Sequence, residues 1–362
     1  LNREFLVFLM EHFDVIAVGA GSGLTIGDSA ASLGLKVALV EKGPMGGTCL
    51  NRGCIPSKML IHSGDVAETI MNSSNFGIRS KVSSVDFKNI VSKVSRIVDK
   101  DAREIEEGIR EDKNITLFKT EGKFIGKKSM LVGSSTITAD KIFIMAGTRP
   151  LVPPIEGLKE SGFLTSKEAL RLKKLPKTLT IIGGGYIAAE LAHFFGSLGT
   201  KINILQRDPL LIPREDSDVA ETFTSIFRKK FNVFLGYNAE KVEKKAGKYV
   251  VTASHGKLKK KIKSDQLLLA VGRVPNSDIL DVHKTGVKTN KHGYIVTNDY
   301  LETTAKDVWA GGDIAGKWLF KHSANLETKY MYQNAFGSEK MKVDYYPMPH
   351  AIFSSPQIAS VG

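Results

Sequence analysis

An apolar run over residues 14–18 leads directly into a glycine-rich turn, and this combination constrains the fold more than any other part of the chain. The run predicts a buried parallel strand. Glycines in such a turn let backbone N–H groups approach a pyrophosphate at the start of the next helix. The glycines concerned are Gly19, Gly21 and Gly23. A second apolar run, residues 36–40, ends in Glu41, where a ribose-binding carboxylate is expected. The segment therefore predicts a dinucleotide-binding β-α-β unit.

A second unit of the same kind begins at residues 178–182. Its G-x-G-x-x-A pattern is complete at Gly183, Gly185 and Ala188. The first unit instead carries Leu24 at its last glycine position, which predicts looser packing of helix against strand there. For either motif alone, an ordinary β-turn-α connection is the alternative. Together they predict an α/β protein with two Rossmann-like nucleotide-binding domains.

The end of the next strand in the second unit bears on the choice of nicotinamide nucleotide. An acid there would bind the ribose 2′-hydroxyl of NAD, whereas an arginine suits the 2′-phosphate of NADP. The strand at residues 201–205 is followed by Gln206 and Arg207, with Arg214 a few residues later. We therefore expect NAD(P)H with a preference for NADPH. The alternative is that both arginines are solvated surface charges.

The chain contains only two cysteines, Cys49 and Cys54, and four residues separate them. A zinc site would need more ligands, and we predict no metal site. A disulfide between such close cysteines is strained, and strained disulfides tend to be labile and catalytic. Cys54 precedes a predicted helix whose N-terminus favours a thiolate, and Lys58 adds a positive charge one turn later. The pair predicts a redox-active dithiol, with two reduced cysteines packed in a turn as the alternative.

The run GGTCLNRGCIPSK over residues 46–58 resembles the active-site motif of the class I pyridine nucleotide–disulfide oxidoreductases. That family includes dihydrolipoamide dehydrogenase, glutathione reductase, mycothione reductase and mercuric reductase. The resemblance implies that the protein binds FAD. It also implies that Cys54 is the thiol that lies against the flavin, and that Cys49 is the thiol that exchanges with the substrate disulfide.

The same resemblance assigns further positions. Gly47 and Thr48 would contact the flavin nucleotide, and Lys58 would sit beside the flavin ring. Lys58 would pair with Glu190, and Tyr186 would gate the nicotinamide pocket.

Three shorter segments resemble the same family pattern. They are residues 145–150 with Gly147, residues 271–276 with Gly272 and Arg273, and residues 308–313, which would deliver Asp313 to the ribityl hydroxyls. Met145 and Ala146 depart from the pattern, which predicts the loss of one hydroxyl contact. A helix from near Leu319 to near Phe336 would point its N-terminus at the flavin, with His322 as a helix-start contact rather than an acid–base group.

The order of the motifs predicts that the second nucleotide-binding domain is inserted into the first. The expected segments are residues 1–149 (first FAD-binding segment with the dithiol), 150–275 (NAD(P)-binding domain), 276–344 (second FAD and central segment) and 345–362 (start of a truncated dimerisation domain). Helices are expected over residues 60–72 and 87–109. The second helix should present to the core Phe87, Ile90, Val91, Val94, Ile97 and Val98. Residues 115–144 read as a β-meander, and residues 150–154 as a linker.

The net charge of +13 raises the question of nucleic-acid binding. The lysines are spread out, and the densest run, Lys259–Lys261, lies in an apparent hairpin without an aromatic platform. We therefore expect a solvated face, or steering of anionic cofactors, rather than nucleic-acid binding. The apolar run Phe5–Met10 is too short to span a membrane and lacks a signal-peptide pattern. These features predict a cytoplasmic protein with no membrane partner, in which Met10 could be the natural start.

The last residues, 349–362, resemble only the first strand of the family's interface domain. In the family, the remainder of that domain carries most of the dimer interface and a catalytic His–Glu pair. The full-length protein is therefore expected to be a homodimer. In this chain His350 is followed by Ser355 at the spacing of that pair, so the sequence offers no replacement for it.

The first functional hypothesis is a dihydrolipoamide dehydrogenase-like enzyme that acts on a small dithiol or disulfide. The alternative in the same class is an NADPH-dependent reductase of a low-molecular-weight disulfide, similar to mycothione or glutathione reductase. Mercuric reductase ranks lower because no N-terminal metal-binding cysteine pair is present. A non-catalytic flavin redox sensor is the alternative from another class.

Overall fold

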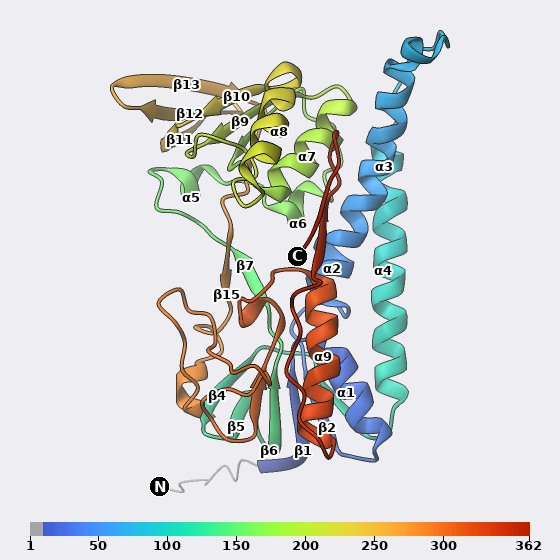
Figure 1. Cartoon of the computed structure of the whole chain (residues 1–362), viewed down its shortest axis with the longest axis vertical. Coiled ribbons are helices and arrows are strands. Elements are labelled where there is room, and N and C mark those ends of the chain that lie inside the picture. Colours follow the sequence, from blue (N-terminus) through green and yellow to red (C-terminus); the bar gives the residue numbers. More distant parts are fainter. Residues whose placement is uncertain (1–9) are drawn as a thin grey trace, which may run out of the picture.

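The computed structural model describes residues 10–362, so the prediction for the apolar run over residues 5–9 lies outside the described residues. The chain forms two α/β lobes that lie one above the other along the long axis of the molecule (Figure 1). The first lobe is built on the strands β1–β6 and β16, and the second on β8–β14. Among the described residues, no helix is both long and apolar enough to cross a membrane.

The first lobe has a sheet in the order β3-β2-β1-β6-β5-β4, and β16 also pairs with β6. Its strands are β1 (Met10–Val18), β2 (Val37–Val40), β3 (Ile115–Phe118), β4 (Gly122–Gly126), β5 (Ser129–Val132), β6 (Ser135–Ile144) and β16 (Val308–Ala310). Strands β3, β2, β1, β6 and β16 run parallel, and α1 (Gly23–Ser32) connects β1 to β2. This is the order of a doubly wound nucleotide-binding sheet.

The predicted β-meander over residues 115–144 is wrong in its first part. Strand β3 pairs in parallel with β2, and only β4, β5 and β6 form consecutive antiparallel pairs. A strand's pattern of apolar residues does not name its partner, and the α-helical connection before β3 returns it to the parallel side of the sheet.

The second lobe has a four-stranded parallel sheet in the order β10-β9-β8-β14. Its strands are β8 (Thr178–Ile182), β9 (Lys201–Gln206), β10 (Asn232–Leu235) and β14 (Gln266–Leu269), with helices α7 (Tyr186–Ser197) and α8 (Ser217–Lys230). An antiparallel sheet of β11 (Asn238–Lys245), β12 (Lys248–His255) and β13 (Leu258–Ser264) packs beside it. The hairpin predicted around Lys259–Lys261 is confirmed as β12–β13.

The chain enters and leaves the second lobe through two short strands, β7 (Thr148–Pro150) and β15 (Arg273–Pro275), which pair antiparallel. Helices α5 (Leu158–Ser161) and α6 (Ser166–Ala169) follow the entry. After β15 the chain returns to the first sheet as β16. The predicted fold class, an α/β protein with the second nucleotide-binding domain inserted into the first, is confirmed. The individual segment boundaries stay predictions.

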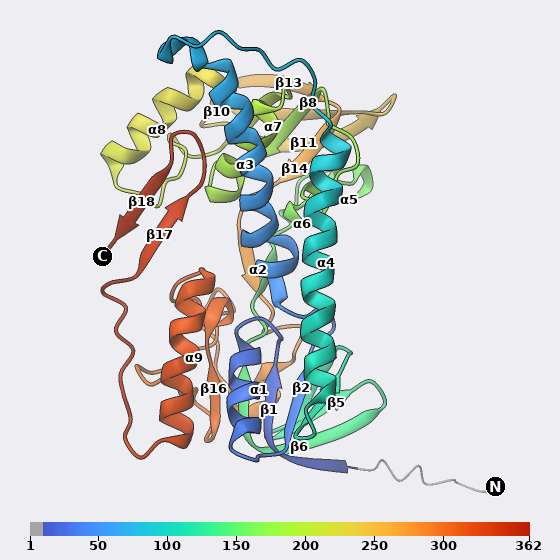
Figure 2. The same ribbon diagram turned by 90° about the vertical axis from the view of Figure 1, so that its right-hand side faces the viewer.

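Between β2 and β3 the chain forms three helices: α2 (Gly47–Arg52), α3 (Cys54–Met71) and α4 (Phe87–Glu111). Helix α3 packs against α4 and against α7 of the second lobe (Figure 2). The predicted apolar face of α4 is buried at most positions, but Ile97 is 36% exposed, because its position turns away from the core. The 3₁₀ turns are η1 (Ser73–Phe76), η2 (Val282–Thr285) and η3 (Gly312–Ile314).

The last elements are α9 (Lys321–Phe336) and a hairpin of β17 (Pro349–Ile352) and β18 (Ile358–Val361). Sequence predicted one strand here, whereas the residues form two, because Ser354–Gln357 make a turn between them. The hairpin lies beside the second lobe (Figure 2), and Ile352 is fully buried in the same apolar cluster as Phe194. The C-terminal hairpin (residues 349–361) is therefore packed into the molecule.

Candidate redox site and nucleotide cradles

The two cysteines lie on either side of a break between consecutive helices. Cys49 belongs to α2, Cys54 begins α3, and Gly53 separates the helices. A Cβ atom on Gly53 would stand 2.9 Å from the carbonyl oxygen of Thr48, so the tight break excludes any larger residue. Both cysteines are free thiols, Cys49 half-buried and Cys54 exposed. The break brings two thiols that are five positions apart to within hydrogen-bonding reach.

The acid–base behaviour of the pair differs from the expectation at Cys54. A hydrogen bond from the Cys54 thiol lowers the pKa of Cys49 to about 7, and the nearby ammonium of Lys321 acts in the same direction. Donating that hydrogen bond raises the pKa of Cys54. The backbone N–H groups of Cys54 and Ile55, at the start of α3, also act on Cys49. The N–H groups at the start of α3 therefore favour a thiolate at Cys49, whereas the sequence pattern predicts one at Cys54.

An ion pair between the lobes stands next to the thiols. The Nζ atom of Lys58, on α3, lies 2.7 and 2.8 Å from the two carboxylate oxygens of Glu190, on α7. Glu190 also accepts the backbone N–H of Phe353 at 3.0 Å, and the Lys58 ammonium lies 4.9 Å from the centre of the Phe353 ring. The predicted contact between Lys58 and Glu190 is thus present, and the segment after β17 completes it.

The first glycine turn is shaped by close backbone contacts. Gly19 has φ +101°, and a Cβ atom there would lie 2.5 Å from the carbonyl oxygen of Met145. A Cβ on Gly47 would lie 2.7 Å from the Cα atom of Gly21. These two glycine contacts keep a shallow backbone cradle open at the start of α1, which fits a pyrophosphate.

Two details of the first unit differ from expectation. The close helix–strand contact falls at Gly23, whose added Cβ would lie 3.1 Å from the Cβ of Met145, so Leu24 does not loosen the packing. Met145, which departs from the family pattern, places its thioether against Gly311 and Gly312 and fills that space. The Glu41 carboxylate accepts the N–H groups of Ala20 (2.8 Å) and Gly43 (2.6 Å), which fixes it at the edge of the cradle.

Asp313 is held by residues from the crossing strands. The hydroxyl of Thr148 donates to its carboxylate at 2.8 Å, and the guanidinium of Arg273 donates to the hydroxyl and carbonyl oxygens of Thr148, each at 2.7 Å. Gly147 and Gly272, beside these two residues, have φ +63° and +123°. Sequence reasoning missed Thr148, although it lies directly after Gly147 in the quoted motif.

The start of α9 reaches the first unit through Lys321. Its Nζ atom donates to the hydroxyl of Ser22 at 2.8 Å, and Ser22 donates to Asn325 at 2.9 Å. Burial lowers the pKa of Lys321. Sequence reasoning also missed Lys321, because Lys321 lies near Cys49 only through the packing of α9. His322 contacts the carbonyl oxygen of Pro349 and is exposed.

The second glycine turn resembles the first. Gly183 has φ +111°, and a Cβ atom there would lie 2.3 Å from the carbonyl oxygen of Ala270. Gly185, directly before α7, would place a Cβ atom in open space. Ala188 is fully buried in the first turn of that helix. The N-terminus of α7 is thus accessible to an anionic group.

Gln206 and Arg207 point in different directions. Gln206 is buried beneath Gly184, and its amide donates to Asp208 at 3.0 Å and to the carbonyl oxygen of Leu210 at 3.3 Å. It therefore shapes the loop after β9 rather than facing solvent. Arg207, directly after β9, and Arg214, later in the same loop, are both exposed.

Tyr186 begins α7 and lies against Phe320, which directly precedes α9, and against His350 of β17. Its hydroxyl donates to Glu215 at 2.6 Å, and burial raises its pKa, with Glu215 adding to that effect. Its ring stacks on Phe320 and His350, with centroids 6.1 Å away in each case. Sequence reasoning missed Glu215 and His350 here, since 135 positions separate the two residues.

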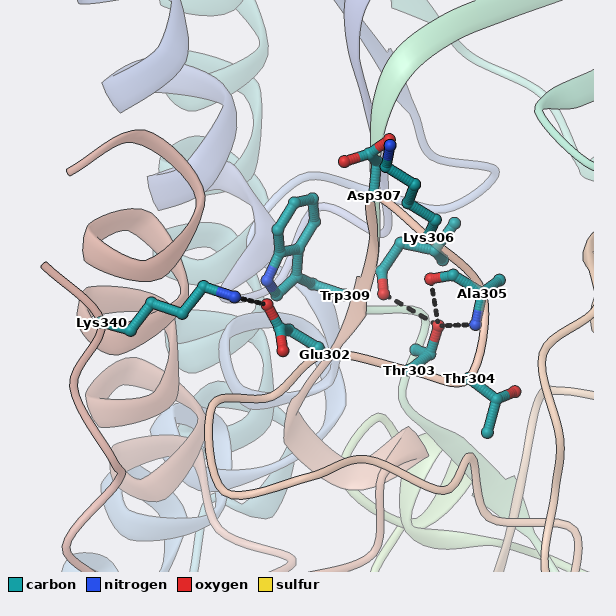
Figure 3. Close-up of a pocket in the computed structure, with 9 residues that line it drawn as sticks. Glu302, Thr303, Thr304, Ala305, Lys306, Asp307, Trp309 and Lys340 are labelled. Atoms are coloured by element: carbon teal, nitrogen blue, oxygen red, sulfur yellow. Dashed lines mark hydrogen bonds and ion pairs between the residues drawn. The ribbon is translucent and has the colours of Figure 1, made fainter. Parts of the chain in front are cut away.

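A pocket of about 430 Å³ lies elsewhere on the first lobe (Figure 3). It is lined by residues 302–309 and Lys340, and Lys340 pairs with Glu302. The turn at its centre precedes β16, whereas Asp313 follows that strand. Nucleotides bind at the carboxyl ends of parallel strands, so this pocket is at the wrong edge of the sheet to hold one.

Comparison with known proteins agrees with this site. The family model described as "Pyridine nucleotide-disulphide oxidoreductase" matches residues 13–335. The chain is 35% identical over 353 residues to a mercuric reductase of Bacillus cereus, covering 97% of this chain and 56% of that protein. It is 33% identical over 364 residues to the mycothione reductase of Mycobacterium tuberculosis, covering 98% of this chain and 78% of that protein. A dihydrolipoyl dehydrogenase of Bacillus subtilis is 33% identical over 356 residues, with 96% and 75% covered.

The chain spans 56–65% of the length of the three mercuric reductases it matches. Among solved structures, the Cu(II) complex of the HOCl-induced flavoprotein disulfide reductase RclA from Escherichia coli superposes with a TM-score of 0.87 at 30% identity. The match covers 98% of this chain and 78% of that one. With the glycine turns, the thiol pair and these likenesses in agreement, the chain belongs to the pyridine nucleotide-disulphide oxidoreductase family.

Proposed function

We propose that this protein is a flavin-dependent disulfide oxidoreductase, which passes electrons between NAD(P)H, FAD, the Cys49–Cys54 pair and a small dithiol or disulfide. The observation that carries the proposal is the pair of free thiols on either side of the break between α2 and α3, with the Lys58–Glu190 ion pair one turn further along α3. A non-catalytic redox sensor would need the two thiols. It would need neither the Lys58–Glu190 ion pair nor Tyr186 at the start of the second nucleotide unit.

The residues present fit FAD. Where Gly47 approaches Gly21, a Cβ atom would occupy the space that a pyrophosphate needs. Glu41 and Asp313 follow parallel strands at their carboxyl ends, where their carboxylates could accept hydrogen bonds from hydroxyl groups of FAD. When bound, FAD would accept a hydride from the nicotinamide and supply two electrons to the Cys49–Cys54 disulfide.

The thiol pair would carry out exchange with the substrate in two steps. The thiolate of Cys49 attacks one sulfur of the substrate disulfide, which breaks the S–S bond, releases one thiol and leaves a mixed disulfide on Cys49. Cys54 then loses its proton and attacks the sulfur of Cys49, which releases the second thiol and closes the Cys49–Cys54 disulfide. The substrate gains two electrons from the dithiol and two protons, one from Cys54 and one from solvent. The lowered pKa of Cys49 suits it to the first attack.

Our first candidate for the substrate is lipoamide, by analogy with the dihydrolipoyl dehydrogenases. A second candidate is NADPH-driven reduction of a low-molecular-weight disulfide. Arg207 and Arg214 are exposed, and Gln206 stands at the end of β9 where NAD-binding proteins carry an acid. Both features favour NADPH, and therefore favour the second candidate, in which electrons pass from NADPH to the disulfide. Sequence identity is similar for both kinds of relative. We also propose that the full-length protein is a cytoplasmic homodimer.

The test is an anaerobic reductive titration of the flavin-loaded protein with NADPH and NADH in parallel. A long-wavelength absorbance band after two electrons is expected, because the family resemblance places Cys54 against the flavin, and a bound flavin would favour the negative charge of the reduced pair on that sulfur. Faster reduction by NADPH is expected, and exchange of Arg207 and Arg214 for glutamine should remove the difference. Flavin bleaching without that band would show that the thiols are not coupled to the flavin, as in the sensor alternative.

A substrate panel then separates the candidates. Lipoamide, glutathione disulfide, mycothione and Hg²⁺ are supplied in turn as acceptors. Cys49→Ser should abolish turnover of any disulfide while leaving flavin reduction intact. Disulfide turnover by that variant would contradict the assignment of Cys49.

A further inference from the structure

Glu215 is a buried carboxylate outside the thiol site, on the loop between β9 and α8. Only 2% of its side chain is exposed. It accepts three hydrogen bonds, from the hydroxyl of Tyr186 (2.6 Å), from Nε2 of His350 (2.9 Å) and from the hydroxyl of Ser360 (3.0 Å). Burial opposes its charge, but these donors keep the pKa of Glu215 below its ordinary value, so it remains a carboxylate.

The three donors come from three separate elements. Tyr186 begins α7, His350 lies on β17 and Ser360 lies on β18. Glu215 itself is the neighbour of Arg214. One carboxylate therefore joins the start of the second nucleotide unit to both strands of the C-terminal hairpin.

The ring of Tyr186 is held as firmly as its hydroxyl. It lies nearly parallel to Phe320 (14°) and to His350 (21°), and those two rings stack on each other with centroids 5.3 Å apart. A tyrosine fixed at both ends cannot swing without breaking a hydrogen bond to a charge and separating stacked rings.

We propose that Glu215 is a positioning residue that latches Tyr186 in its closed position over the nicotinamide pocket, through the hydroxyl-to-carboxylate hydrogen bond. The inference rests on the proposed function and on the family resemblance, by which Tyr186 would gate the nicotinamide pocket and would have to move for the nicotinamide to enter. A latch lowers the population of the open form, and the apparent nucleotide affinity falls by the same factor.

The direction of the effect separates a latch from mere support. If Glu215 only supported the loop that carries Arg214, its loss would weaken nucleotide binding. If it is a latch, its loss opens Tyr186 more often and tightens binding.

The experiment is calorimetric titration of NADP⁺ into the flavin-loaded full chain, for the wild type, Tyr186→Phe, Glu215→Gln and the double variant. NADP⁺ is used because it binds without turnover. Tyr186→Phe removes the hydrogen-bond donor and should lower the Kd about tenfold, and Glu215→Gln should lower it severalfold. The double variant should match Tyr186→Phe, because without the Tyr186 hydroxyl no bond to residue 215 remains for the second change to weaken.

Ser360→Ala is the matched control. It removes one donor from Glu215 but leaves the bond to Tyr186, so the Kd should stay within about twofold of the wild type. Trp318 supplies a second readout, since its ring lies 6.3 Å from that of His350. The fluorescence of Trp318 should change when NADP⁺ binds to the wild type. In Trp318→Phe only the buried Trp309 still emits, so loss of the change in that variant assigns the signal to Trp318.

An unchanged or higher Kd in both Tyr186→Phe and Glu215→Gln would overturn the latch while leaving the proposed function intact. Absence of binding by the wild type, with NADP⁺ and with NAD⁺, would overturn the proposed function and the latch with it. Urea unfolding of each variant shows whether a weaker affinity comes from a damaged fold.

Discussion

Cys49 and Cys54 carry the same side chain, yet their neighbours give them opposite acid–base behaviour. The thiol of Cys54 donates to the sulfur of Cys49, which lowers the pKa of Cys49 and raises that of Cys54. The ammonium of Lys321 strengthens the effect from a helix that lies far along the chain. At the scale of single residues, the acid–base behaviour of Cys49 thus depends on the neighbouring thiol, on a distant charge and on the first N–H groups of α3.

The pair predicts a pH profile for alkylation of the reduced protein. The thiolate fraction of Cys49 should rise as pH increases through about 7, so iodoacetamide should label Cys49 first, with a midpoint near that pH. Cys54→Ser keeps a donor and should retain the low midpoint. Cys54→Ala removes it and should move the midpoint toward about 8.5. Mass spectrometry of the labelled peptides measures both, and preferential labelling of Cys54 in the wild type would contradict the assignment.

At the scale of elements, each β-turn-α unit uses its glycines for two different purposes. Gly183 permits a left-handed backbone that packs against the carbonyl oxygen of Ala270, which is a requirement of the fold. Gly185 faces open space before α7, which is a requirement of a ligand rather than of the protein. The two requirements can be separated by experiment because they fall on different residues.

Gly183→Ala and Gly185→Ala should therefore have different consequences. Gly183→Ala should lower the free energy of unfolding by at least about 2 kcal/mol, since its Cβ meets backbone and its φ is positive. Gly185→Ala should leave that free energy within about 0.5 kcal/mol but weaken NADP⁺ binding, because its methyl group occupies the approach to the helix N-terminus. Urea unfolding and nucleotide titration test the pair. Equal losses of stability would show that Gly185 is not kept open for a ligand.

At the scale of the whole molecule, the C-terminal hairpin joins segments that are far apart in the chain. It supplies the N–H that contacts Glu190, two donors to Glu215, and two oxygens of Ser355 that accept from Lys230. Ile352 is fully buried among side chains of the second lobe. The hairpin therefore links the ion pair at the thiols to the start of the second nucleotide unit.

Ile352→Ala tests whether this docking contributes to stability. Removal of a buried isoleucine side chain should lower the free energy of unfolding by about 2–5 kcal/mol. Val361→Ala is the control in the same hairpin, and because Val361 is 70% exposed, the change should stay within about 0.5 kcal/mol. Denaturant unfolding measures both. Similar small values for the two variants would indicate that the hairpin does not pack against the second lobe.

The sequence by itself determined the α/β fold class, the two glycine turns and the position of the thiol pair. These features are local: an apolar run, a glycine that alone adopts a positive φ, and two cysteines at a helix break each act over a few neighbouring residues. The pairing of Lys58 with Glu190 was also predictable, but only from a family resemblance.

Tertiary structure decided what no local pattern encodes. The parallel pairing of β3, the inward turn of Gln206 and the contribution of Lys321 to the lowered pKa of Cys49 depend on partners brought in by packing. The contact of Glu215 with His350 joins residues 135 positions apart. Such contacts are made by side chains whose own residue types are ordinary, so the chain's fold, rather than its composition or spacing, selects them.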